Sequence, residues 1–452
     1  MKNDRFKKVI EILKYIFLII LFILTNKSNS IFGIISILYI LFLVISGKDK
    51  ENIKLLLFLL PNLRILDITG FKNYINICYL IIGIKIIIKN YKNIEGKNIL
   101  KAIILAMTIV LMEIIHGISI ENNITESIFN GVNIGIDFFI LIVIINLQIN
   151  LKEYSEYSDY LLLGVISSFG IFCLSNGNII NLLFSTGYRL SAYGNDPNYL
   201  SCYLLVGISG KLLYSHYQKL NIKDIILTIF NTFIGLLTSS KMCLISLIIL
   251  YALNIFIFLS KLKIKKIIRI IIFTILLITI LITFYGKETN YLINRFVDRF
   301  NETHSFSNTE IGNFTSGRSD LIMQYFNILS NDITSLLLGH GIRYINYYLK
   351  MGVTLVAHNT YLDIILSWGI IGTTILVIGF ISCTKNILKI KQKFDILIPL
   401  IIYMIMLNAL SCLSSDMFWY LLAFVLLPLS KKFVIYEEEK NEYINNSSNI
   451  LS

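Results

Sequence analysis

Residues 241–260 read KMCLISLIILYALNIFIFLS, and after Lys241 this run contains no charged side chain. About 20 apolar residues make a helix long enough to cross the roughly 30 Å hydrocarbon layer of a membrane. Apolar runs of similar length recur along the 452 residues, of which 56% are hydrophobic and 15% charged. A typical soluble domain is about 25% charged. The sequence therefore predicts a polytopic membrane protein and excludes a soluble fold or a single-span receptor.

We expect an all-α fold, a polytopic transmembrane helix bundle of about 12–14 spans with one large extracytoplasmic loop. The weakest expected span is 53–69, because Pro61, Arg64 and Asp67 interrupt it, and a short or broken helix is an alternative there. The chain divides into eleven spans, a loop with interfacial helices, three further spans and a cytoplasmic tail expected to be disordered: 1–285, 286–357, 358–431 and 432–452.

The net charge of +12 is explained by topology rather than by nucleic acid. With the N-terminus inside, most of the 40 Lys and Arg residues fall on the cytoplasmic side, as the positive-inside rule expects. The short outer loops hold only Lys27, Arg64, Lys72, Arg189 and Lys241. We therefore expect a multi-pass protein of the cytoplasmic (inner) membrane with both termini in the cytoplasm, bound to the lipid bilayer and to no nucleic acid.

The six cysteines all lie inside apolar runs. No C-x-x-C pair and no Cys/His cluster at metal-ligand spacing is present, so the sequence predicts neither a disulfide framework nor a metal site. No cofactor is indicated.

Cations on the expected outer face are few, and topology does not explain them. Arg189 begins a polar stretch that ends at Asp196-Pro197-Asn198, where Asp196 suits the cap and Pro197 the first turn of a helix. Lys241 stands where two spans meet, and Arg318 opens an amphipathic helix. Taken singly, each has a simpler explanation: a capped helix entrance, a charged turn and an ordinary helix start.

The densest outer cluster contains two of the five histidines. Gly339-His340-Gly341-Ile342-Arg343 precedes Ala357-His358-Asn359, and Gly369 and Gly372 follow in the next span. Asn359 suits the cap of that span, and two glycines three apart permit close helix approach. A lone histidine at a helix start is more often a hydrogen-bonding residue than a catalyst, but two histidines and an arginine around one linker favour a site.

This set of side chains suits one reaction class. Guanidinium groups match phosphate oxygens bidentately, and a neutral imidazole accepts a proton from a hydroxyl at physiological pH. Displacement of a lipid-linked pyrophosphate by an acceptor hydroxyl needs both, because charge grows on the leaving pyrophosphate.

The same residues resemble the bacterial O-antigen ligase and polymerase superfamily. His358-Asn359, nine residues and then Gly369-Ile370-Ile371-Gly372 fit the pattern H-[N/S/Q]-x9-G-x-x-G of O-antigen ligases. Arg189 with its Gly-x-Asp-Pro-Asn and the Ser-Gly-Arg ending at Arg318 are similar to further motifs of the superfamily, over roughly 185–375. Where many relatives have Ser-Arg, this chain has Ser240-Lys241, which keeps the charge and loses the bidentate geometry.

The resemblance implies a metal-independent glycosyltransferase that uses undecaprenyl-pyrophosphate-linked glycan at the extracytoplasmic face, with other polysaccharide assembly proteins as possible partners. Because polymerases are the more widespread group, we expect it to polymerise lipid-linked oligosaccharide repeat units. Carried over by motif, His358 is the general base, and Arg189 and Arg318 bind pyrophosphate. The remaining candidates for substrate binding are Lys241, His340, Arg343 and Asn359.

Three alternatives stay open. A ligase that transfers finished glycan to an acceptor has the same motifs. A peptidoglycan glycosyltransferase of the shape–division type requires an outer aspartate, for which Asp298, Asp320 and Asp332 are available. A flippase or transporter requires charges near the middle of the membrane, for which the candidates are Glu113, Asp137 and Asp363.

Overall fold

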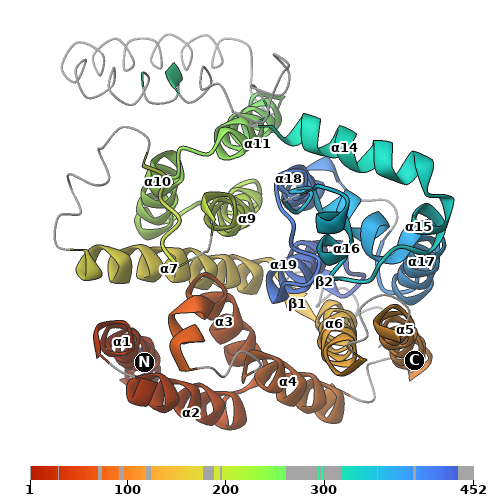
Figure 1. Cartoon of the computed structure of the whole chain (residues 1–452). Coiled ribbons are helices and arrows are strands. Elements are labelled where there is room, and N and C mark those ends of the chain that lie inside the picture. Colours follow the sequence, from red (N-terminus) through yellow and green to blue (C-terminus); the bar gives the residue numbers. More distant parts are fainter. Residues whose placement is uncertain are drawn as a thin grey trace, which may run out of the picture.

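The computed structural model describes residues 2–28, 30–69, 74–90, 96–118, 124–176, 188–193, 196–260, 294, 297–298, 315, 317–353, 355–389 and 393–435. Helices make up about four fifths of this part of the chain and strands almost none of it, so the all-α prediction is confirmed (Figure 1). The expected span at 267–285 lies outside the described residues.

The first half of the chain contains α1 (Lys2–Ser28), α2 (Ser30–Ser46), α3 (Asp49–Leu59), η1 (Leu60–Thr69), α4 (Tyr74–Asn90), α5 (Gly96–His116), α6 (Ile124–Ile145) and α7 (Leu151–Ser175). The described helices after α7 are α9 (Pro197–Ser215), α10 (Ile222–Leu237), α11 (Lys241–Ser260), α14 (Arg318–Asn331), α15 (Ile333–Leu338), α16 (Ile345–Lys350), α17 (Thr360–Thr384), α18 (Phe394–Leu407), α19 (Asp416–Leu426) and η3 (Leu427–Leu429).

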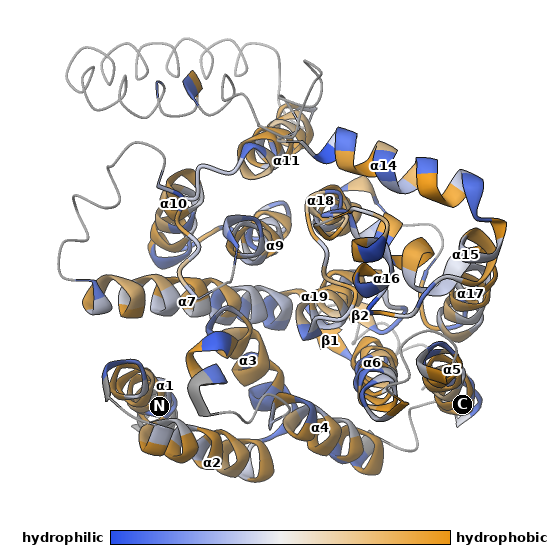
Figure 2. Cartoon of the chain, in the orientation of Figure 1, coloured by the Kyte–Doolittle hydropathy of each residue, from blue (hydrophilic) through white to orange (hydrophobic). Residues whose placement is uncertain are grey.

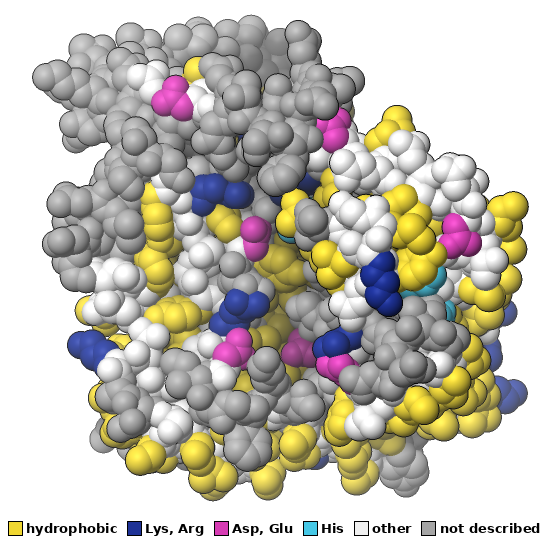
Figure 3. Space-filling model, in the orientation of Figure 1, with side chains coloured by type: hydrophobic (Ala, Val, Ile, Leu, Met, Phe, Trp, Pro, Cys, Tyr) yellow, Lys and Arg dark blue, Asp and Glu magenta, His cyan; other side chains and the backbone are white. Residues whose placement is uncertain are grey.

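Six of the described helices are long and apolar enough to cross a membrane, namely α1 from Val9, α5, α6, α7, α11 and α17. Three shorter apolar helices cover Ser30–Ser46, Phe394–Leu407 and Asp416–Leu429. Apolar side chains are widely exposed, including Phe42 at 61%, Ile88 at 69% and Phe256 at 70%. Long stretches of most helices are coloured as hydrophobic in Figure 2. On the face shown in Figure 3, apolar side chains follow much of the lower and right-hand edge. A multi-pass membrane protein explains this surface.

The expected span at 53–69 is broken. Helix α3 ends at Leu59, and the chain continues as the 3₁₀ helix η1 because Pro61 cannot donate a backbone hydrogen bond. This confirms that the proline interrupts the span.

Helix α9 lies in the interior of the bundle. It packs against α7, α10, α11 and α18, and nearly all of its side chains are buried (Figure 1). Helix α7 begins with a capping box, in which the Asn150 side chain accepts from the Glu153 N–H and the Glu153 carboxylate accepts from the Asn150 N–H. Because α7 and α9 are both fixed in the core, the loop between them is held at both ends.

A second, smaller apolar core joins α14 and α16 to the first two turns of α17. Its buried members are Leu321, Tyr325, Leu329, Tyr344, Tyr348, Val353, Ala357, Leu362 and Leu366. The Tyr325 hydroxyl also donates to the carbonyl oxygen of Leu355 at 2.7 Å. The described part of 317–357 is therefore packed onto α17 rather than loosely attached.

A short pair of parallel strands joins the segment before α7 to the segment after η3. β1 (Ile149–Asn150) pairs with β2 (Phe433–Val434). The tail expected to begin at 432 thus starts with an ordered strand, and 436–452 lie outside the described residues.

Candidate functional site

Four of the predicted site residues line one cavity of about 280 Å³. Arg189 comes from the loop between α7 and α9, Lys241 begins α11, Arg318 begins α14 and Asn359 precedes α17. The lining is completed by Asn198, Met242, Ile245, Thr315, Ser319, Ile322 and Asn408. Three cations from separate segments therefore meet in a cavity whose described lining contains no Asp or Glu.

The loop that carries Arg189 is tied to its neighbours through the backbone. The Leu190 N–H donates to the Leu237 carbonyl at the end of α10 at 3.3 Å, and the Tyr193 N–H donates to Ser168 Oγ of α7 at 3.2 Å. These bonds fix the short segment that directly follows Arg189.

The entrance of α9 is capped as the sequence predicts. The Asp196 carboxylate accepts from the Asn198 N–H at 2.7 Å, and Pro197 occupies the first turn. Arg189 lies seven residues before Asp196 in the sequence, and its Nε is buried without a hydrogen-bond partner. A buried donor without a partner is unusual in a folded protein and is available to a ligand.

Lys241 is placed by the turn between α10 and α11. The Ser240 hydroxyl accepts from the Cys243 N–H at 3.1 Å and donates to Asn198 Oδ1 at 2.6 Å. Asn198 belongs to α9 and is only 4% exposed. Because Ser240 joins this turn to α9, Lys241 lies beside the segment that carries Arg189.

Arg318 is the first residue of α14, and the predicted helix start is confirmed. Gly317 precedes it with φ 79°, a left-handed conformation that glycine adopts without steric cost. Thr315 Oγ1 accepts from the Ser319 N–H at 3.2 Å and so satisfies a donor of the first turn.

Asn359 caps α17, again as predicted. Its Oδ1 accepts from the N–H groups of Tyr361 at 3.0 Å and Leu362 at 3.1 Å. His358 precedes this cap, outside the lining of the cavity, and lies close enough to Arg318 for that charge to act on its imidazole.

The backbone is left-handed beside three of the lining residues. Within the described chain, the only non-glycine residues with positive φ are Ala192 at 45°, Ser239 at 49° and His358 at 48°. Each lies within three residues of Arg189, Lys241 or Asn359. Such conformations cost about 1–3 kcal/mol each and gather at functional sites.

Burial and like charge lower the pKa values of the arginines. Burial lowers the pKa of Arg189, which Asp196 partly restores. Burial also lowers the pKa of Arg318. The charge of Asp196 raises this pKa, and the charge of Arg189 lowers it further. Neither guanidinium makes a hydrogen bond or ion pair with any described residue. Partly buried cations without partners are destabilising unless an anion joins them.

The imidazole of His358 is kept neutral. Burial lowers its pKa below the ordinary value of 6.5, the charge of Arg318 lowers it further, and Asp196 opposes the shift. A neutral imidazole is a proton acceptor at physiological pH.

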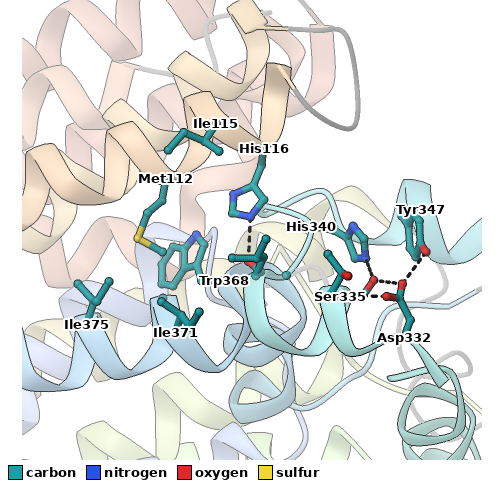
Figure 4. Close-up of a pocket in the computed structure, with 14 residues that line it drawn as sticks. Met112, Ile115, His116, Asp332, Ser335, His340, Tyr347, Trp368, Ile371 and Ile375 are labelled. Atoms are coloured by element: carbon teal, nitrogen blue, oxygen red, sulfur yellow. Dashed lines mark hydrogen bonds between the residues drawn. The ribbon is translucent and has the colours of Figure 1, made fainter. Parts of the chain in front are cut away.

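The remaining two predicted residues lie elsewhere. His340 lines a separate cavity between α5, α15 and α17, where its Nε2 is 2.6 Å from Ser335 Oγ and its ring stacks on Tyr347 (Figure 4). Arg343 is paired with Glu126 of α6. Sequence proximity to His358 therefore does not bring either residue to the cationic cavity.

The two glycines of the H-[N/S/Q]-x9-G-x-x-G pattern have different roles. Gly369 has φ 62° and breaks α17, and a Cβ there would lie 2.2 Å from the Leu337 carbonyl oxygen. Gly372 packs against Met112 of α5, whose Cε would lie 2.3 Å from an added Cβ. Close helix approach is confirmed for Gly372, whereas Gly369 admits the backbone at the end of α15 into the break.

Sequence reasoning missed several neutral lining residues. Asn198 stood in the quoted polar stretch, and its amide could have been assigned from the helix start that it shares with Asp196. Asn408 at the end of α18 had no local signal, because only the tertiary fold brings it to the cavity. Among the described residues, no three His, Cys, Asp or Glu side chains gather so as to hold a metal ion.

Comparison of the chain with protein families, with curated proteins and with solved structures finds no match. The geometry of the cavity is therefore the basis for assigning a function.

Proposed function

We propose that this protein is a membrane glycosyltransferase of about 12–14 spans that polymerises undecaprenyl-pyrophosphate-linked oligosaccharide repeat units at the extracytoplasmic face of the cytoplasmic membrane. The single observation that carries the proposal is the meeting of Arg189, Lys241 and Arg318 in one cavity with no acidic lining residue. Its resemblance to the O-antigen ligase and polymerase superfamily supplies the reaction.

A pyrophosphate fits the charge of this cavity. Its several negative charges would balance three cations that otherwise repel one another, and the two guanidinium groups offer planar pairs of N–H donors to its oxygens. Lys241 adds a third charge without bidentate geometry. The same groups would stabilise the charge that grows on the departing pyrophosphate in the transition state.

The apolar part of the lining suits the rest of the carrier lipid. Met242 and Ile245 belong to α11, a helix long enough to cross the membrane, and Ile322 belongs to α14. A polyprenyl chain attached to the bound pyrophosphate would pass along these side chains toward the hydrocarbon layer.

His358 would act as general base. The acceptor hydroxyl oxygen forms a bond to the anomeric carbon, and its proton passes to the imidazole. The bond from the anomeric carbon to the pyrophosphate oxygen breaks, and its electron pair leaves with undecaprenyl pyrophosphate. The reaction needs an unprotonated His358, which the lowered pKa favours.

Deletion of the protein in its host tests this proposal through the surface glycan. Loss of a polymerase should leave single repeat units, and complementation with His358→Ala or Arg318→Ala should fail to restore chain length. Arg343→Ala, which removes an arginine from outside the cavity, is the control and should restore it. Full-length chains stranded on the carrier lipid would identify a ligase, and an unchanged glycan in all strains would exclude both enzymes.

A further inference from the structure

The cavity that His340 lines differs in charge from the cavity lined by Arg189, Lys241 and Arg318. It has a volume of about 400 Å³ and lies between α5 and α17, both long enough to cross a membrane, with α15 at one end. None of its lining residues, all within the described chain, is a lysine or an arginine. Arg343 does not line it, because its guanidinium is paired with Glu126.

Polarity is graded along this cavity (Figure 4). One end is formed by Met112, Trp368, Ile371 and Ile375, and the other by residues around Asp332. The apolar end lies deeper along both helices, since Ile375 comes after the break in α17 and Met112 comes before the last turn of α5. An amphiphile at a membrane interface has the same gradient, with a polar head above an apolar chain.

The apolar end is continuous with the outer surface of the bundle. Ile371 is 47% exposed and Ile375 is 42% exposed, while Ile115 of α5 is 62% exposed. These side chains face the surroundings of two membrane-length helices, where the solvent is hydrocarbon. A lipid chain can therefore enter from the side without crossing water.

The polar end carries one full negative charge. The Asp332 carboxylate accepts from the Ser335 hydroxyl and N–H and from the Tyr347 hydroxyl at 2.9 Å. The Ser335 bonds are the main reason that the pKa of Asp332 lies below its usual value, so the carboxylate is ionised. An anionic head group would be repelled there, and a cationic one attracted.

One buried nitrogen at this end lacks a partner. Because the Ser335 hydroxyl donates to Asp332, Ser335 Oγ accepts from His340 Nε2–H, which leaves His340 Nδ1 as an acceptor. Burial lowers the pKa of His340 to about 4, so the ring is neutral. His340 is 8% exposed, and its Nδ1 has no hydrogen-bond partner. A head group with N–H donors would satisfy it.

We infer that this cavity binds one apolar chain of a lipid whose head group carries an ammonium, with the chain between α5 and α17 and the head at Asp332. The inference does not depend on the proposed glycosyl transfer, since it concerns a different cavity and a different ligand charge.

The two tryptophans of the chain give a direct test. Trp368 lines the cavity and is 1% exposed, whereas Trp419 is 2% exposed and packs on Phe138 and Phe418. Brominated alkyl chains quench tryptophan on contact. In detergent, Trp419→Phe should show saturable quenching by a brominated alkylammonium, and Trp368→Phe should show none. If Trp419→Phe does not fold, the unchanged chain compared with Trp368→Phe isolates the same signal.

Head-group preference is measured with the same brominated chain bearing a phosphate. We expect half-saturation at about fivefold lower concentration for the ammonium than for the phosphate, the size of effect that a single partly exposed carboxylate provides. Asp332→Asn should remove most of this preference, and Glu156→Gln, on α7 away from the cavity, should leave it unchanged.

Three results would overturn the inference: quenching that rises without saturation, as for lipid that only surrounds the protein; equal quenching of Trp368→Phe; and binding of the phosphate as tight as that of the ammonium. Loss of function in the glycan assay would leave these outcomes unaffected, so the two proposals fail independently.

Discussion

Replacing Arg318 by glutamine should stabilise the protein while abolishing its function. Arg318 makes no ion pair with a described residue, and Arg189 lines the same cavity. A sphere of 280 Å³ is about 8 Å across, and two like charges at that distance repel by about 2 kcal/mol at an effective dielectric constant of roughly 20. Attraction to Asp196 and solvent screening reduce this to roughly 1 kcal/mol. For a chain of this length we expect a rise of about 1–2 °C in the unfolding temperature.

The assay is thermal unfolding of the purified protein in detergent, followed by intrinsic fluorescence, together with glycan chain length in the complemented host. Arg343→Gln is the matched control, because it removes an arginine that is paired with Glu126. We expect it to lower the unfolding temperature slightly and to leave the glycan unchanged. If Arg318→Gln destabilises the protein as much as Arg343→Gln does, the account of Arg318 as an uncompensated cation is refuted.

Three further predictions follow from the same geometry. Asp196→Asn keeps a good helix cap but removes a charge that raises the pKa of His358, so the acid limb of the pH–rate profile should move to lower pH; a shift to higher pH would contradict this. Gly369→Ala should destabilise the protein by about 2–4 kcal/mol, because the new Cβ meets the Leu337 carbonyl oxygen at 2.2 Å. Gly352→Ala, at φ 87° with nothing within 4 Å, should cost about 1 kcal/mol. Denaturation measures the free energy of unfolding of both variants. Lys241→Arg should retain glycan chain length in the host and Lys241→Gln should shorten it; equal lengths would remove Lys241 from the site.

Local signals in the sequence were enough for several helix starts and for one interruption. The caps at Asp196 and Asn359 and the interruption at Pro61 each depend on a few neighbouring residues, and the structure has all three. The convergence of Arg189, Lys241 and Arg318 was expected only because all three stood on the same expected side of the membrane, Arg189 and Lys241 beside spans and Arg318 in the large loop. That side is a property of topology, which the distribution of lysine and arginine indicates.

Sequence spacing did not predict that His358 lies beside the cationic cavity while His340 lines a separate one. Loop 339–341 is hydrogen-bonded to α17, with the His340 N–H donating to the Leu366 carbonyl at 2.9 Å. This docking needs the break at Gly369, and a glycine in an apolar run does not show whether it permits helix packing or a left-handed turn. Only the tertiary contact with Leu337 distinguishes the two.

The pairing of β1 with β2 has a practical consequence for anyone who attaches a fluorescent reporter to the carboxyl end. In the register of this parallel pair, Ile149 lies opposite Phe433 and Asn150 opposite Val434. A fusion joined directly after η3 would replace β2 and leave β1, at the start of α7, without its partner strand. A fusion joined after Ile435 keeps the strand pair intact, so reporter fusions for mapping membrane topology should begin beyond that residue.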